Sequence, residues 1–414
     1  MKYLLYLIFI LAINCFGLYS WQYFAVGRNS LGFIIVTTTS IFVIIDQYKN
    51  RNKDSSNSLK SIINLIFILI GLQLVRNYME GVSLKDIIAG ISLISPIFIV
   101  IPLVDYLNSK ARIETFVNFI LIVGFISSLI CIFQFISGKQ LQGSMVSIYN
   151  GTYNRIYHPG AILMAFCFFI QFSRYFIYGY LNKNSKSLLF APFYIIGIGL
   201  TLHRSLISLL IIGILVIFVF YYFYSNRFYK RKRILSILLV FFLFFGLISN
   251  SSIAGLFQDR YDEGKTEVMT NEGNYAFRFL IITKSLEAIY QSNFLFGKGF
   301  NYNTDMSQFD PLGLTADADY GNVVVNFGYT GLLLWVLLYI QMLIASIKLY
   351  IKELDPFYKM LLLAIIPMPI LFLSIGFFGQ VMHYTPNLII LITCFAFIKS
   401  IKSISNKEKL SKLI

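Results

Sequence analysis

The stretch LTLHRSLISLLIIGILVIF, residues 200–218, holds one charged residue, Arg204, followed by a mainly apolar run. A bilayer core of about 30 Å needs roughly 20 such residues to be crossed by one helix. A charge at the start of the run costs a few kcal/mol unless it is paired or reaches water. The stretch therefore predicts a membrane-spanning helix with a cation at its N-terminal end.

The rest of the chain repeats this pattern. Of its 414 residues, 57% are hydrophobic and only 13% are charged, and the mean hydropathy is +0.72. These values exceed those of a soluble globular protein. We therefore predict an all-α polytopic membrane protein with about 12 transmembrane helices. The predicted spans lie near 3–19, 30–46, 60–76, 87–104, 114–136, 157–178, 188–201, 205–224, 234–249, 322–346, 360–376 and 385–400.

The domain organisation follows from these spans. Residues 1–414 are predicted to form a single integral membrane domain, whose first span follows Lys2 and lacks a small-residue cleavage site. The longest polar interval, 250–321, is predicted to be a large extracytoplasmic loop between spans 9 and 10. It holds more than half of the 19 acidic residues, and a loop of this length is usually functional or disordered.

The orientation follows from the basic residues, because short loops rich in Lys and Arg stay in the cytoplasm. With the N-terminus inside, the inner segments hold most of the 34 Lys and Arg residues, including the clusters at 227–233 and 399–412. Both termini are then cytoplasmic. The net charge of +15 reflects topology and attraction to an anionic inner leaflet, and it gives no support to nucleic-acid binding.

Part of the 250–321 loop has a helical pattern. In NYAFRFLIITKSLEAIYQSNFLFGKGFNYN, residues 274–303, apolar side chains recur at near-helical spacing. An amphipathic helix lying along the membrane surface is expected. Gly297 and Gly299 would allow a tight turn that brings the backbone near a ligand, although surface turns also commonly use glycine.

Two arginines are candidates for binding phosphate. Arg204 opens the span at 205–224, and Arg278 opens the amphipathic stretch. A guanidinium offers planar, paired donors that match phosphate oxygens and keeps its charge at every relevant pH. The alternatives are an interfacial arginine that snorkels to lipid headgroups at 204 and an ordinary loop residue at 278.

The loop ends in TADADYGNVVVNFGYTGLLL, residues 315–334. Asp317, Asp319 and Tyr320 stand just before the tenth span, and a carboxylate there could accept a proton from a sugar hydroxyl. Helix capping is the alternative role for such an Asp. Gly328 and Gly331 could let another helix approach closely.

Taken together, these motifs resemble the bacterial O-antigen polymerase and O-antigen ligase family. The resemblance covers about residues 150–335 by motif. HRS at 203–205 stands where the family often has Ser-Arg-Gly, so Arg204 takes the role of that arginine while His203 and Ser205 depart from the pattern. Arg278 matches the arginine that opens the helix of the large periplasmic loop.

The remaining motifs of the resemblance follow the same order. FLFGKGF, 294–300, stands where the family often has a Pro-Leu-x-Gly-x-Gly turn. Asp317 falls where the ligases usually have a catalytic histidine, with Tyr320, Gly328 and Gly331 at the expected offsets, and this departure favours a polymerase. GTYNRIYHPGAILMAF, 151–166, resembles the segment that enters the sixth span, with Arg155 and His158 as looser candidates.

The resemblance implies a membrane glycosyltransferase in the bacterial inner membrane with an extracytoplasmic active site. Its substrate would be an undecaprenyl-pyrophosphate-linked oligosaccharide, and its further partners would be membrane lipids and, as a candidate, a chain-length regulator protein. Arg204, Arg278 and Asp317 would be catalytic. The expected substrate-binding residues are Arg155, His158, His203, Asp319, Tyr320, Gly297 and Gly299.

The implied reaction is inverting and uses no cofactor. The two arginines would neutralise the leaving pyrophosphate, so no divalent metal is required. Asp317, with Asp319 or a nearby histidine as the alternative, would be the general base.

Two other functions stay open. One is an O-antigen ligase that transfers finished glycan to lipid A core or protein. The other is a polysaccharide flippase or other transporter, which would need charged or broken helices around a midplane cavity and paired repeats. Transport is the less favoured of the two because the ionisable residues collect at one face.

Overall fold

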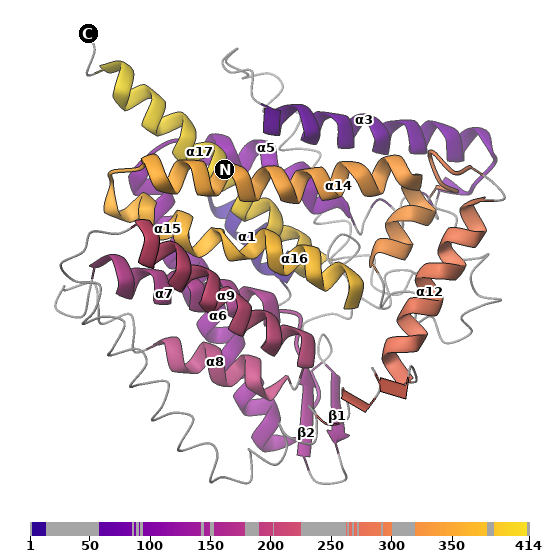
Figure 1. The fold of residues 1–414 in the computed structure, drawn as a ribbon, viewed down its shortest axis with the longest axis horizontal. Helices are drawn as coiled ribbons and strands as arrows, with labels where there is room; N and C mark the ends of the chain where they lie inside the picture. The colour runs from indigo at the N-terminus through magenta and orange to yellow at the C-terminus, as the bar shows by residue number, and fades with distance from the viewer. Residues whose placement is uncertain are drawn as a thin grey trace.

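The structure, a computed structural model, describes residues 2–13, 58–84, 94–141, 145–149, 153–178, 190–201, 203–224, 273–290, 293–299, 319–378 and 385–411, with a few single residues between these ranges. Within them the chain forms a bundle of helices with one short hairpin (Figure 1). The helices are α1 (Lys2–Ile13), α3 (Ser58–Met79), α5 (Val100–Tyr106), α6 (Lys110–Ser137), α7 (Ala161–Tyr178), α8 (Ala191–Leu200), α9 (Arg204–Tyr224), α12 (Gly273–Tyr290), α14 (Asp319–Lys352), α15 (Pro356–Ile365), α16 (Pro367–Phe378), α17 (Thr385–Ser411) and the 3-10 helix η2 (Ser95–Ile99).

The prediction of a helical, polytopic membrane protein is confirmed. Seven helical segments of the described part are long and apolar enough to cross a membrane. They are Ile62–Met79, Lys110–Ser137, Ala161–Tyr178, Ser205–Tyr224, Asp319–Lys352, Pro356–Gly376 and Pro386–Asn406. Because the predicted spans 30–46 and 234–249 lie outside the described residues, the count of about 12 stays a prediction.

Two predicted spans are shorter or less regular than expected. The 87–104 span contains η2 followed by α5, and Pro96 stands near the start of η2. Proline has no N–H and interrupts the ladder of an α-helix, which accounts for the irregular start. The 188–201 span is the ten-residue helix α8, about 15 Å long at 1.5 Å per residue.

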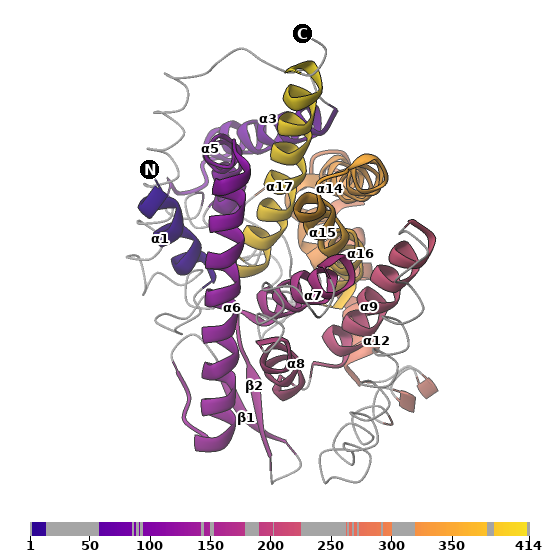
Figure 2. The same cartoon turned by 90° about the vertical axis from the view of Figure 1, so that its left-hand side faces the viewer.

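A β-hairpin precedes α7, in the loop between the predicted spans 114–136 and 157–178, for which no strand was expected. Strands β1 (Met145–Tyr149) and β2 (Tyr153–Tyr157) pair antiparallel, with Ser147 opposite Arg155. β2 contacts α6, and Figure 2 shows the hairpin beside the far end of that helix from α5. The Asn-Gly dipeptide that follows β1 in the sequence is a recognised hairpin signal, and it could have predicted this element.

The apolar stretches of α7, of α15 with α16, and of α17 are mostly buried, whereas only a minority of the residues in those of α9 and α14 are buried. α14 contacts α3, α12 and α16, and α9 contacts α16. This arrangement gives α9 and α14 large apolar outer faces, as expected of helices that border lipid.

One end of the bundle is defined by the start of α14 and the end of α16, and we call it the site end. It lies at the right of Figure 1, where α12 stands beside the first part of α14. α14 is not continuous there, because Gly328 has φ 66° and ψ −169° inside the helix. Glycine adopts this conformation readily because it lacks a Cβ.

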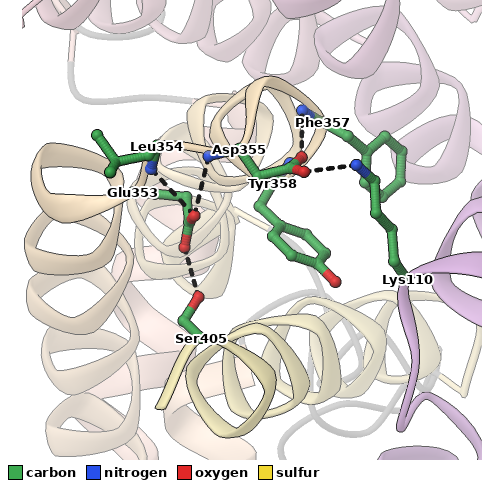
Figure 3. A network of polar contacts seen from close by, with 7 residues as sticks. All are labelled: Lys110, Glu353, Leu354, Asp355, Phe357, Tyr358 and Ser405. Atoms are coloured by element: carbon green, nitrogen blue, oxygen red, sulfur yellow. Dashed lines mark hydrogen bonds and ion pairs between the residues drawn. The ribbon is translucent and has the colours of Figure 1, made fainter. Parts of the chain in front are cut away.

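A polar network ties the opposite end together (Figure 3). Asp355 caps α15 by accepting from the backbone N–H groups of Phe357 at 2.8 Å and Tyr358 at 3.3 Å. Its other oxygen lies 2.5 Å from the ammonium of Lys110, at the start of α6. Ser405 of α17 donates to Glu353 at 2.6 Å. The junction between α14 and α15 is thereby fixed to two other helices.

Candidate functional site

α12 lies along the first part of α14. A Cβ placed on Gly321 would stand 2.8 Å from the Ser285 hydroxyl and 3.7 Å from Ile281. One helical turn further along each chain, Ile289 packs with Val324 and Val325. Since the contacts advance in the same sense on both helices, the two helices run parallel.

The amphipathic helix predicted in this loop is therefore present as α12, and part of its apolar face packs against α14. Ile281 and Ile289 are buried, and both lie where α12 packs against α14. The first turns of α14 cover these two side chains, and the position of the helix along the membrane surface stays a prediction.

The parallel packing places Arg278 close to the start of α14. Arg278 is half-buried in α12 and precedes Ile281 by three residues, about 5 Å along the helix axis. Asp319 is the first residue of α14 and is fully buried. A carboxylate at this position is favoured by the positive end of the helix dipole. A cation and a buried acid thus stand on neighbouring helices at the site end.

Tyr320 joins α14 to α16. Its hydroxyl donates to the carbonyl oxygen of Leu373 at 2.5 Å, and a Cβ on Gly376 would stand 2.7 Å from its ring. The ring is buried, so it acts as a spacer between the two helices. α16 in turn contacts α9, which begins at Arg204.

The turn at 293–299 is inserted into the interruption of α14. The N–H groups of Tyr329 and Thr330 would bond to Val325 and Asn326 in a regular helix. Here Tyr329 donates to the carbonyl of Phe294 and Thr330 to that of Leu295, both at 3.2 Å.

The turn also takes up the two carbonyls that the interruption of α14 leaves free. The N–H of Lys298 donates to Val325 at 2.6 Å, and that of Gly299 donates to Asn326 at 3.1 Å. The turn therefore replaces two backbone hydrogen bonds of the helix.

α3 holds the other side of this turn. Gln73 donates to the carbonyl of Phe296, Arg76 to that of Gly297 at 2.5 Å, and Asn77 to that of Lys298 at 3.5 Å. These three residues were not predicted from the sequence. The signal was present, since three polar side chains at i, i+3 and i+4 share one face near the end of an apolar span.

The predicted glycines occupy the centre of this assembly. Gly297 has φ 71° and Gly299 has φ 83°, and both are buried. A Cβ on Gly297 would collide with the α14 backbone, and one on Gly299 would collide with the Asn77 side chain. Since their N–H groups donate to carbonyls of the protein, the glycines serve a close approach between segments. Their expected approach to a ligand stays a prediction.

A second group of predicted residues lies between β2 and α9. The rings of Tyr157 and His203 meet edge to face, with centroids 5.7 Å apart. His158 is buried, and its Nδ1 accepts from the N–H of Gly160 at 2.9 Å. Arg155 belongs to β2 and Arg204 is the first residue of α9, while the side chains of both lie outside the described part.

The structure thus gathers the predicted residues into two groups that α16 connects. Arg278, Asp319, Tyr320, Gly297 and Gly299 lie on α12, the turn and α14. Arg155 and Arg204 lie on β2 and α9, His158 directly follows β2, and His203 directly precedes α9. Asp317 lies outside the described residues. Its role as the base stays a prediction.

No group of three or more His, Cys, Asp or Glu side chains that could hold a metal ion occurs among the described residues. Asp317 and Asp319 are two residues apart in the sequence, and carboxylates are ligands that Mg²⁺ accepts. Metal-independent catalysis therefore stays a prediction.

No protein-family model matches this chain, and no curated protein is significantly similar to it.

Proposed function

We propose that this chain is a polysaccharide polymerase, a membrane glycosyltransferase that joins lipid-linked oligosaccharide repeat units at the outer face of the bacterial inner membrane. The observation that carries the proposal is the packing of α12, which bears Arg278, along the start of α14, which bears the buried Asp319. The motif resemblance to O-antigen polymerases and ligases supports the same assignment.

The site end is assigned to the extracytoplasmic side. At the opposite end of the bundle, α14 finishes with Lys348 and Lys352, and Lys110 and Lys359 stand nearby on α6 and α15. Basic residues concentrate on the cytoplasmic side of membrane proteins. This distribution supports an outward-facing site end, where a carrier lipid in the outer leaflet could reach Arg278.

The proposed reaction is a direct displacement. The oxygen of an acceptor sugar hydroxyl attacks the anomeric carbon of the donor glycan, and the bond between that carbon and the pyrophosphate oxygen breaks. Undecaprenyl pyrophosphate leaves with the bonding electrons, the hydroxyl proton passes to Asp317, and the anomeric centre inverts.

The positive charges would act on the leaving group. Arg278 of α12 and Arg204 at the start of α9 are assigned to the pyrophosphate, where negative charge grows as the glycosidic bond breaks. Fixed donors aimed at developing charge stabilise a transition state without reorganisation. Two guanidinium groups also offer paired donors to phosphate oxygens.

The assignment is tested by deleting the gene and separating the cell-surface glycans by electrophoresis. Loss of a polymerase leaves products with a single repeat unit. Polymer that accumulates on its lipid carrier would instead identify a ligase. Loss of every surface repeat, with the repeat units retained at the inner leaflet, would identify a transporter. An unchanged glycan ladder would contradict all three functions.

A further inference from the structure

The turn at 293–299 is held between α14, which follows it in the chain, and α3, which lies more than 200 residues before it. On one side, its backbone forms four hydrogen bonds with α14 around Gly328. On the other side, three side chains of α3 donate to its successive carbonyls at 296, 297 and 298. The turn is therefore a joint between α3 and α14.

Arg76 is the strongest donor in this joint. Its Nη1 lies 2.5 Å from the carbonyl oxygen of Gly297, and its Nε lies 2.7 Å from Glu80. Hydrogen bonds from an ionised donor are about twice as strong as neutral ones. The bond to Glu80 fixes the direction of the guanidinium, so that its remaining edge faces the turn.

The joint also controls α12. This helix ends at Tyr290, three residues before the turn begins at Asn293. Only residues 291 and 292 separate the two in the sequence, so the position of the turn limits where the end of α12 can lie. Because α12 packs against α14 through Ser285 and Gly321, the position of the turn decides how closely Arg278 approaches Asp319.

We propose that Arg76 is a positioning residue: by holding the Gly297 carbonyl it keeps the turn in the interruption of α14 and so holds α12, with Arg278, against the start of α14. This role rests on the proposed function for its catalytic consequence, but its structural part can be measured without any activity. Gln73, which is buried and donates to Phe296, supports the same docking.

The structural part is tested by the reactivity of a thiol placed at the α12–α14 contact. Ser285 is fully buried, so a Ser285→Cys variant should react slowly with a maleimide. The background is Cys15→Ala, since Cys131, Cys167 and Cys394 are buried. Adding Arg76→Ala should raise the labelling rate about tenfold, which matches the loss of one charged hydrogen bond.

Two further variants make this measurement specific. Val75→Ala changes an exposed neighbour on α3 and should leave the labelling rate unchanged. Gln73→Leu removes the second donor with an apolar side chain of similar size, and it should also raise the rate. This variant gives the test a second arm if Arg76→Ala reduces the amount of folded protein. An unchanged rate in both Arg76→Ala and Gln73→Leu would overturn the proposal.

The catalytic part is tested with a lipid-linked repeat unit as the substrate. Arg76→Ala should lower kcat more than it changes KM, because Arg76 itself does not touch the substrate, and Arg76→Lys should recover part of kcat. Faster labelling together with full polymerisation by Arg76→Ala would overturn the positioning role. If labelling responds as expected but the unmodified protein makes no polymer, the proposed function is wrong and the docking by Arg76 stands.

Discussion

Gly321 of α14 lies directly against Ser285 of α12: a Cβ at Gly321 would stand 2.8 Å from the serine Oγ and 3.4 Å from its Cβ. The first distance is too short for any real pair of atoms of this kind, whereas the second is an ordinary contact. The hydroxyl oxygen of Ser285 is therefore the atom that excludes even an alanine at position 321.

Gly321→Ala should push α12 away from α14 and lower the free energy of unfolding by roughly 1–3 kcal/mol, the range for overpacking a close contact. Polymer formation should fall with it. Adding Ser285→Ala should restore both, because it removes the colliding oxygen, and Ser285→Ala alone should be nearly neutral. The two single variants and the double variant are compared by thermal unfolding in detergent and by the yield of polymer. Additive effects of the two substitutions would contradict the contact.

The two acids at the start of α14 are expected to differ in importance. Asp317→Asn keeps size but removes a base, so it should lower activity by roughly 10²-fold if proton transfer limits the rate. Asp319→Asn should be milder, consistent with a buried orienting or helix-end role. Polymer made per unit of enzyme is the measurement, with and without a chelator. Normal activity of Asp317→Asn would overturn its assignment, and loss of activity with the chelator would show that a metal is required.

The orientation can be measured with thiols at two exposed positions. Glu287 lies on α12 with 56% of its side chain exposed, and Leu354, at the opposite end, is 91% exposed. In a Cys15→Ala background, Glu287→Cys should react with an impermeant maleimide in intact spheroplasts. Leu354→Cys should react only after lysis. The reverse pattern would place the site end in the cytoplasm and contradict the proposed function.

The helices and the general architecture could be predicted from the sequence because long apolar runs identify spans without reference to their neighbours. The same reasoning located α12 from the near-helical spacing of its apolar residues within 274–303. It could not identify α14 as the surface that covers these side chains, since periodicity reports that a face is apolar and not what it packs against.

The candidate site was predictable only where one segment carries the signal. The glycines of the 293–299 turn are visible in the sequence, and their positive φ angles agree with what such residues permit. Their partners are not visible, because Arg76 meets Gly297 across more than 200 positions of the chain. Such pairing depends on the tertiary arrangement, and without related sequences it leaves no local pattern.

The polar network at the opposite end should affect stability and not catalysis. Asp355→Ala removes the cap of α15 and should cost about 1 kcal/mol. Asp355→Asn keeps a capping oxygen and loses only the ion pair with the half-exposed Lys110, so it should cost less. Thermal unfolding measures the difference, and activity per folded molecule should not change in either variant. Equal destabilisation by both variants would show that the ion pair matters more than the cap.

The central claim is that this chain polymerises lipid-linked repeat units with Arg204 and Arg278 at the leaving group. The most direct measurement incubates the purified protein with one defined undecaprenyl-pyrophosphate-linked repeat unit and resolves the products by size. The unmodified protein and Lys284→Ala, which removes a cation from the exposed side of the same helix as Arg278, should give a ladder of polymers. Arg204→Ala and Arg278→Ala should give none at normal protein abundance, and replacement by Lys should fail at one or both sites because a point charge lacks paired donors. Absence of a ladder from the unmodified protein, or full ladders from both alanine variants, would contradict the account.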